Sequence, residues 1–215
     1  MFGFVPELSG VVGLLGYCGI AVFAVSGALD AARNRMDILG FMLIGTATGL
    51  GGGTLRDLLL GLAPVYWVRE PAYITLCLVV AAITYFVVPF IDSRKRALVW
   101  MDAIGLSLFS VTGTQIALTA GVAPLVAVCM GVMTATFGGI IRDVLCGESL
   151  VLGGRELYVT AALAGASTHL GLVLISVPDD LALLGGFVVA LGLRSAAILF
   201  GLKLPAYQGR SGDGQ

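Results

Sequence analysis

Two stretches of this sequence repeat each other and decide its fold: Gly51-Gly-Gly-Thr-Leu-Arg-Asp57 and Phe137-Gly-Gly-Ile-Ile-Arg-Asp143. A shift of the chain by 86 residues aligns them, and residues 23–61 then match residues 109–147 at 13 of 39 positions. A match over that length indicates an internal duplication. Each copy is therefore expected to fold in the same way as the other.

The sequence around both stretches has the composition of a membrane protein. Of 215 residues, 58% are hydrophobic and 12% are charged, whereas soluble domains carry about 25% charged residues. Cuts at charges and prolines leave seven segments close to the ~20 residues that cross a bilayer as a helix. These segments are 8–29, 38–61, 71–91, 97–118, 122–147, 157–177 and 181–201. We therefore expect an all-α membrane protein with seven transmembrane helices.

The duplicated unit holds three of these segments, which places repeat 1 at residues 8–91 and repeat 2 at residues 97–177. Because three is an odd number, the second repeat enters the membrane from the opposite side, and the two repeats are inverted. Segment 181–201 follows as a seventh helix outside the repeats. Residues 1–201 are expected to form a single transmembrane domain, and residues 202–215 a cytoplasmic tail.

The loop charges predict how the chain lies in the membrane. Cytoplasmic loops carry an excess of Lys and Arg. On one side the loops and tail hold Arg33, Arg35, Arg94, Lys95, Arg96, Arg155, Lys203 and Arg210, and the other side holds only Arg69. The N-terminus is therefore expected outside the cell and the C-terminus in the cytoplasm.

Composition and motifs exclude several classes of function. The net charge of −1 leaves no basic surface for nucleic acid. The four cysteines lie in different apolar segments without CxxC spacing, so neither a disulfide framework nor a metal site is expected. No motif of a hydrolase, a P-loop protein or a zinc protease occurs. We expect no catalysis and no cofactor.

Consecutive glycines stand inside the second and fifth segments. Each costs a helix about 1 kcal/mol relative to alanine, so we expect both helices to be broken there. Unwound backbone at membrane depth is tolerated where protein or a water-filled cavity satisfies it. The alternative is a seam at which small residues let two helices approach closely, and both can hold together. The glycines expected to form the breaks are Gly51, Gly52, Gly53, Gly138 and Gly139.

An arginine and an aspartate follow each glycine group inside an apolar segment. A charge at the centre of a bilayer costs roughly 2.5 to 3.5 kcal/mol, which favours a role in lining or gating a pore. Because adjacent residues on a helix do not face each other, we expect Arg56 to pair with Asp143 and Arg142 to pair with Asp57. The alternative is local pairing near the membrane surface.

Asp102 and His169 are two further polar residues within the apolar segments. Asp102 has no basic neighbour within a helical turn, which makes it a candidate contact for a cation, and a solvated helix N-terminus is the alternative. A lone imidazole makes no metal site, so His169 is expected to be a hydrogen-bonded residue between helices.

Threonines cluster around the glycines, and Thr48 and Thr134 occupy the same position in the two repeats. Their hydroxyls can replace part of the hydration of an ion. The alternative is that each hydroxyl bonds to the backbone of its own helix. The other threonines in this cluster are Thr46, Thr54 and Thr136.

The seven segments, the inverted repeats and the doubled GG-x-x-RD motif resemble the prokaryotic branch of the trimeric intracellular cation (TRIC) channels, over roughly residues 8 to 201. The resemblance implies a homotrimer in a bacterial inner membrane. It also implies that each subunit has an hourglass pore for monovalent cations, potassium in particular, lined by the second and fifth helices. Arg56, Asp57, Arg142 and Asp143 match the positions that would line or gate this pore.

Two departures from the family pattern affect the expected pore. Phe137 stands where the first repeat has Gly51, so its ring is expected to narrow the path. The lysine that animal members carry beside the glycines is absent, since the only lysines are Lys95 and Lys203. Membrane lipid is an expected partner, but lipid-dependent gating of the animal kind is not carried over.

A potassium-permeable channel is the function that these observations favour. The alternative is a secondary transporter of a small solute such as glycine, because inverted repeats and broken helices occur in both classes. The residues alone do not separate the two classes, although the small size of the chain favours one channel per subunit. A purely structural protein has no need of four charges inside the membrane.

Overall fold

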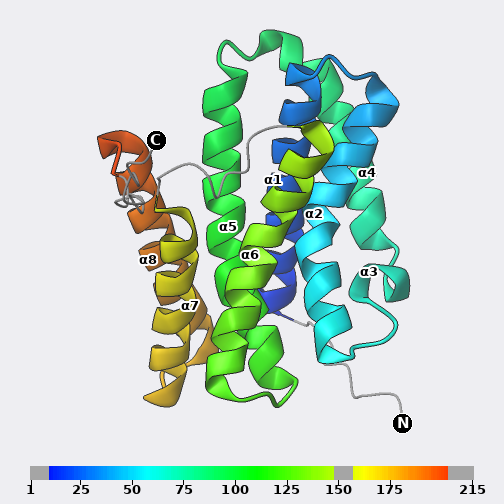
Figure 1. Cartoon of the computed structure of the whole chain (residues 1–215). Coiled ribbons are helices and arrows are strands. Elements are labelled where there is room, and N and C mark those ends of the chain that lie inside the picture. Colours follow the sequence, from blue (N-terminus) through cyan, green and yellow to red (C-terminus); the bar gives the residue numbers. More distant parts are fainter. Residues whose placement is uncertain (1–9, 148–156, 203–215) are drawn as a thin grey trace, which may run out of the picture.

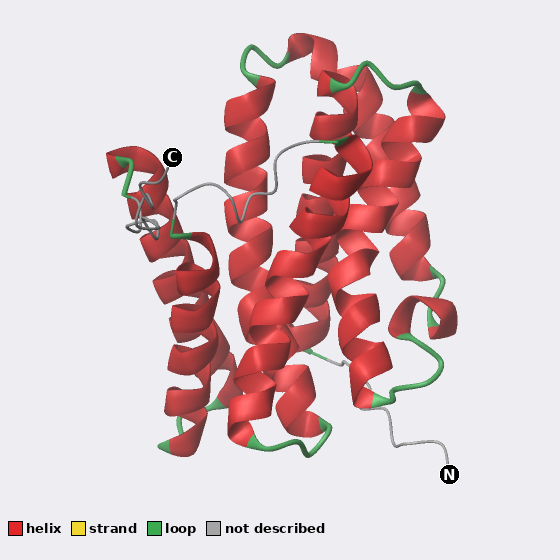
Figure 2. Ribbon diagram, in the orientation of Figure 1, coloured by secondary structure: helices red, strands yellow, loops and turns green. Residues whose placement is uncertain are grey.

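The computed structural model describes residues 10–147 and 157–202, and this part of the chain is built of helices without strands (Figures 1 and 2). The longer helices are α1 (Val11–Arg33), α2 (Ile38–Leu60), α4 (Ala72–Val87), α5 (Arg94–Thr119), α6 (Pro124–Cys146), α7 (Tyr158–Leu174) and α8 (Asp179–Phe200). The short α3 (Tyr66–Arg69) precedes α4, and the 3-10 turn η1 (Val88–Phe90) follows it.

The expected all-α membrane architecture is confirmed. Six helices of the described residues are long and apolar enough to cross a membrane, and α7 is a shorter apolar helix of 17 residues. The short α3, in the loop after α2, was not among the expected segments. The expected tail lies outside the described residues from residue 203 onward, as does the loop at residues 148–156.

The inverted repeat is visible in the directions and packing of the helices. In Figure 1, α1 and α5 run in opposite directions, and so do α2 and α6. The helix α4 packs against α1 and α2, and its counterpart α7 packs against α5 and α6. The extra helix α8 packs against α7 and α5, on the side of the bundle opposite α4.

Equivalent contacts between α1 and α5 occur twice at the centre of the bundle, as the two-fold relation between the repeats requires. A Cβ on Gly19 would lie 2.9 Å from the ring of Phe109, and a Cβ on Gly105 would lie 2.4 Å from the ring of Phe23. The two rings are 5.2 Å apart between centroids. Glycine in α1 therefore admits an aromatic ring from α5, and glycine in α5 admits one from α1.

Both copies of the motif end their helices in the same way. Gly61 after α2 and Gly147 after α6 are left-handed, with φ of 68° and 66°. Glycine takes this conformation without the steric cost of a side chain, which is why it ends many helices. The amide of Gly61 bonds to the carbonyls of Asp57 and Leu58, and the amide of Gly147 bonds to the equivalent carbonyls in α6.

The expected breaks at the glycines are wrong for this structure. The α-helices α2 and α6 continue through Gly51, Gly52, Gly53, Gly138 and Gly139. The physical reason is the seam that was the alternative. A Cβ on Gly52 would lie 2.1 Å from the carbonyl oxygen of Thr134, and a Cβ on Gly138 would lie 2.5 Å from that of Thr48. The glycines let the two backbones touch, and this packing offsets their poor helix propensity.

Candidate functional site

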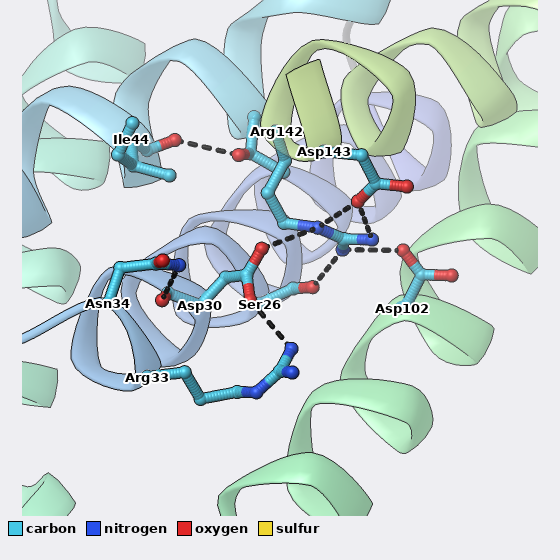
Figure 3. Close-up of polar contacts among 9 residues, drawn as sticks. Ser26, Asp30, Arg33, Asn34, Ile44, Asp102, Arg142 and Asp143 are labelled. Carbon is cyan, nitrogen blue, oxygen red and sulfur yellow. Dashed lines mark hydrogen bonds and ion pairs between the residues drawn. The ribbon is translucent and has the colours of Figure 1, made fainter. Parts of the chain in front are cut away.

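Arg142 of α6 is the centre of a buried polar network (Figure 3). Its side chain is 1% exposed, and its Nε and Nη2 donate to Asp143 Oδ1 at 3.0 and 2.8 Å. Its Nη1 donates to Asp102 Oδ1 at 2.9 Å and to Ser26 Oγ at 2.7 Å. Asp30 Oδ2 lies 3.7 Å from Nε. Helices α1, α5 and α6 thus meet at one guanidinium.

Arg56 of α2 has a simpler set of partners. Its Nε and Nη2 donate to Asp57 Oδ1 at 2.9 and 2.7 Å. The other oxygen of Asp57 accepts the backbone amide of Tyr66 at 3.0 Å, and the Tyr66 ring lies 5.8 Å from Arg56 Cζ. Burial raises the pKa of the Tyr66 hydroxyl well above its ordinary value, although Arg56 opposes the shift. The hydroxyl therefore stays protonated and points to the Leu50 carbonyl at 3.4 Å.

The expected exchange of partners between repeats is wrong, because each arginine binds the aspartate next to it. The long arginine stem lets the guanidinium turn back to the neighbouring carboxylate, although the two residues leave the helix in different directions. The antiparallel crossing of α2 and α6 also separates the motifs. Since Gly52 faces Thr134 and Thr48 faces Gly138, Arg56 and Arg142 lie beyond opposite sides of the crossing.

Four of the five threonines near the glycines bond to the backbone of their own helix, which was the alternative to contact with an ion. Thr48 and Thr134 donate to the carbonyls of Ile44 and Met130 in their own helices, at 2.7 and 2.6 Å. Thr54 and Thr136 bond in the same way to carbonyls four residues before them. The hydroxyl of Thr46 has no hydrogen-bond partner within the described part of the chain. The hydroxyls of Thr48 and Thr134 are therefore already engaged.

Asp102 belongs to the Arg142 network, and Phe137 lies next to Gly138 on α6. Asp102 is 2% exposed and binds Arg142, so its basic neighbour comes from another helix rather than from its own. Phe137 is half-buried on α6, one residue before the glycine that touches α2. His169 makes the expected contact between helices, with its Nε2 2.8 Å from Gln115 Oε1 of α5.

A small cavity lies beside Arg56. Gly53, Tyr66, Tyr73, Phe109 and Thr112 line it together with Arg56. Its volume of about 20 Å³ holds roughly one water molecule. In this conformation the space beside Arg56 is too small for a hydrated ion.

Sequence reasoning missed Ser26 and Asp30, which both reach Arg142. Asp30 was assigned to the polar loop after the first segment, but α1 continues to Arg33 and keeps Asp30 buried. Arg33 binds Asp30 at 2.8 Å from the next turn. The spacing of four residues between Ser26 and Asp30 was the available signal, because it places both side chains on one face of α1.

Comparison with known proteins supports the assignment of the fold. The family model described as "Glycine transporter" matches residues 14–89 and 99–173, one match for each repeat. The UPF0126 inner membrane protein YadS of Escherichia coli (strain K12) is 41% identical over 194 residues, which cover 88% of this chain and 92% of YadS. A UPF0126 membrane protein of Vibrio cholerae is 38% identical over 199 residues, which cover 90% of this chain and 82% of that protein.

Solved structures share the fold over nearly the whole chain. A structure described as the TRIC trimeric intracellular cation channel orthologue from Rhodobacter sphaeroides has a TM-score of 0.88 and 52% identity, and covers 90% of this chain and all of that one. A second, described under conductance through TRIC cation channels, has a TM-score of 0.84 and 33% identity, and covers 94% of this chain and all of that one. These neighbours are ion channels rather than enzymes. The protein is therefore a member of the integral membrane family that the glycine-transporter model describes, and it is similar over most of its length to UPF0126 proteins and to TRIC channel structures.

Proposed function

We propose that this protein is a cation channel permeable to potassium and other monovalent cations, with one pore in each subunit of a homotrimer. The observation that carries the proposal is the pair of buried Arg-Asp motifs on either side of the contact between α2 and α6. The chain that carries these motifs shares its fold with structures that are described as TRIC cation channels. The pore would follow the contact between the two helices.

The charges at the site favour cations over anions. Each arginine is bound to the aspartate beside it, so neither guanidinium is left to attract an anion. Asp102 adds a carboxylate next to Arg142. The backbone carbonyls of Thr48 and Thr134 face the opposite helix at the crossing. Carbonyl and carboxylate oxygens are the groups that replace the hydration shell of a cation.

The conformation described here is closed at the crossing. Since the backbones of α2 and α6 touch at Gly52 and Gly138, an ion passes only if the two helices separate there. The Arg56–Asp57 and Arg142–Asp143 pairs would line or gate the path on the two sides. The ring of Phe137 would narrow it next to Gly138.

The site is set in a bacterial inner membrane, with the N-terminus outside and the C-terminus in the cytoplasm. The excess of basic residues in the loops on one side supports this orientation. A reporter that is active only in the cytoplasm, fused after Gln215, should be active. A silent reporter with full-length protein in the membrane would contradict the orientation.

Lipid and other copies of the chain are the partners proposed for the outer surface. Large apolar side chains are exposed on several helices, as at Leu43, Phe86, Leu125 and Leu184. Exposed apolar surface of this kind suits acyl chains or another subunit. Native mass spectrometry in mild detergent should give the mass of a trimer, and a monomeric mass would contradict the assembly.

Recordings of the purified protein in planar bilayers test the function. We expect unitary current steps in symmetric potassium chloride. The glycine-transporter family model keeps a glycine transporter as the other candidate, although the structural neighbours favour the channel. Bilayers without unitary currents, together with glycine uptake into proteoliposomes driven by an ion gradient, would contradict the channel.

A further inference from the structure

The two inverted repeats surround their buried arginines with different carboxylates. Arg142 binds Asp143 through Nε and Nη2, as Arg56 binds Asp57. Arg142 also binds Asp102. The 86-residue shift that relates the repeats places Gly16 at the position of Asp102. At this position repeat 2 therefore has a buried carboxylate and repeat 1 has a glycine.

Among residues 10–147 and 157–202, Asp102 is an additional carboxylate beside arginines that already have an aspartate partner. Asp143 gives Arg142 the same carboxylate that Asp57 gives Arg56, and Asp30 has its own partner in Arg33 at 2.8 Å. Asp102 shares the guanidinium of Arg142 and is 2% exposed. Buried charges in proteins are paired or bind an ion. A second carboxylate on one guanidinium favours the binding of a further cation.

A buried hydroxyl beside Asp102 points to the same ligand. Tyr158 is 2% exposed, and its hydroxyl has no hydrogen-bond partner in residues 10–147 and 157–202. Around the point where Gly139 would carry a Cβ, the Tyr158 hydroxyl lies at 2.8 Å, Asp102 Oδ1 at 3.4 Å and Arg142 Nη2 at 3.7 Å. Leaving such a hydroxyl without a partner is unfavourable, and a bound water molecule or ion is one way in which a buried group of this kind is satisfied.

Arg194 and Gly139 both contact Tyr158 and fix its position. Arg194 of α8 lies over its ring, with Cζ 5.1 Å from the centroid. Gly139 keeps the space in front of the hydroxyl free of a side chain. The hydroxyl is thereby held beside Asp102, with its oxygen lone pairs available to a cation.

We propose that Asp102 and the Tyr158 hydroxyl bind a monovalent cation between α5, α6 and α7, at a site that only repeat 2 contains. The proposal rests on the proposed function, because it names the place where a permeating ion pauses. Carboxylate and hydroxyl oxygens are ligands that a potassium ion accepts. Since the site belongs to one repeat, ions that enter from the two ends of the pore meet it at different depths. The current is therefore expected to rectify.

Thermal unfolding of the purified full-length protein tests the site without any need for conduction. At equal ionic strength, potassium chloride should raise the melting temperature of the wild type above its value in choline chloride. The variants Tyr158→Phe and Asp102→Asn should lose this potassium-dependent rise. Tyr85→Phe makes the same chemical change on α4, where the ring packs against Phe41, and should keep the rise. A rise that persists in Tyr158→Phe, or that is missing in the wild type, would overturn the site.

Single-channel recordings then connect the site to conduction. Tyr158→Phe should raise the potassium concentration for half-maximal conductance by roughly fivefold, and Tyr85→Phe should leave it unchanged. Gly16→Asp places an acid beside the Arg56 cavity, where the glycine has open space, and should reduce the rectification. Equal half-saturation in Tyr158→Phe and wild type would overturn the role in conduction. If no variant conducts but the potassium-dependent rise is present in the wild type and lost in Tyr158→Phe, the channel function fails and the binding site stands.

Discussion

The carbonyl oxygen of Thr134 in α6 lies only 2.1 Å from the point where Gly52 in α2 would carry a Cβ. The same relationship joins Gly138 to the carbonyl of Thr48 at 2.5 Å, as the two-fold relation between the repeats requires. The centre of the molecule is thus a contact between two backbones. Both the closure of the proposed pore and the stability of the bundle depend on this contact.

Alanine at either glycine should destabilise the protein. Gly52→Ala and Gly138→Ala each force a methyl group into a backbone carbonyl, and overpacking of this kind costs about 1–3 kcal/mol. Thermal unfolding in one detergent should show a lower melting temperature for both. Gly192→Ala is the matched control, because nothing lies within 4 Å of its Cβ position, and it should be neutral or more stable by up to ~1 kcal/mol. Equal stability of the three variants would contradict the contact.

Loss of Arg142 should cost more stability than loss of Arg56. Arg142→Ala leaves Asp143 and Asp102 without their guanidinium, whereas Arg56→Ala leaves only Asp57. Breaking a buried ion pair costs about 3–5 kcal/mol, so both variants should unfold at lower temperature, with Arg142→Ala the lower. Arg96→Ala on the exposed start of α5 is the control and should change little. The reverse order of the two buried variants would contradict the network.

A double-mutant cycle separates pairing within repeat 2 from pairing between repeats. Arg142→Ala and Asp102→Ala should couple in stability, because their side chains are 2.9 Å apart. Arg56→Ala and Asp143→Ala should be additive within about 0.5 kcal/mol, since the two side chains share no partner among the residues that the structure describes. Coupling in the second pair and additivity in the first would restore the exchange between repeats that the sequence alone favoured.

The bond between His169 and Gln115 should hold α7 to α5. His169→Ala removes the partner of Gln115 Oε1, while Gln115 Nε2 keeps its bond to Asp179, and the variant should cost about 1–3 kcal/mol. Thermal unfolding measures this loss. His169→Gln keeps a polar group at the position and should recover part of the stability. Full stability of His169→Ala would show that the contact contributes nothing.

The membrane fold follows from the sequence because apolarity and the 86-residue duplication are properties of the chain as a whole. The continuity of helix α2 through Gly52 does not follow from the sequence. It depends on how closely α6 approaches, because the packing of the two backbones outweighs the low helix propensity of glycine. The partner of Arg142 was missed for a related reason. Pairing with the adjacent Asp143 was kept only as the alternative, because the expected helix geometry ignores the length of the arginine stem. Asp102 and Asp30 come from other helices, which no local pattern places beside α6.

The reversal potential of the wild-type channel in a potassium chloride gradient shows whether the permeating ion is a cation or an anion. Arginines that are bound by neighbouring aspartates, with Asp102 and backbone carbonyls beside the path, should pass cations and exclude chloride. The reversal potential should lie close to the potassium equilibrium potential. A value close to the chloride equilibrium potential would contradict a cation channel.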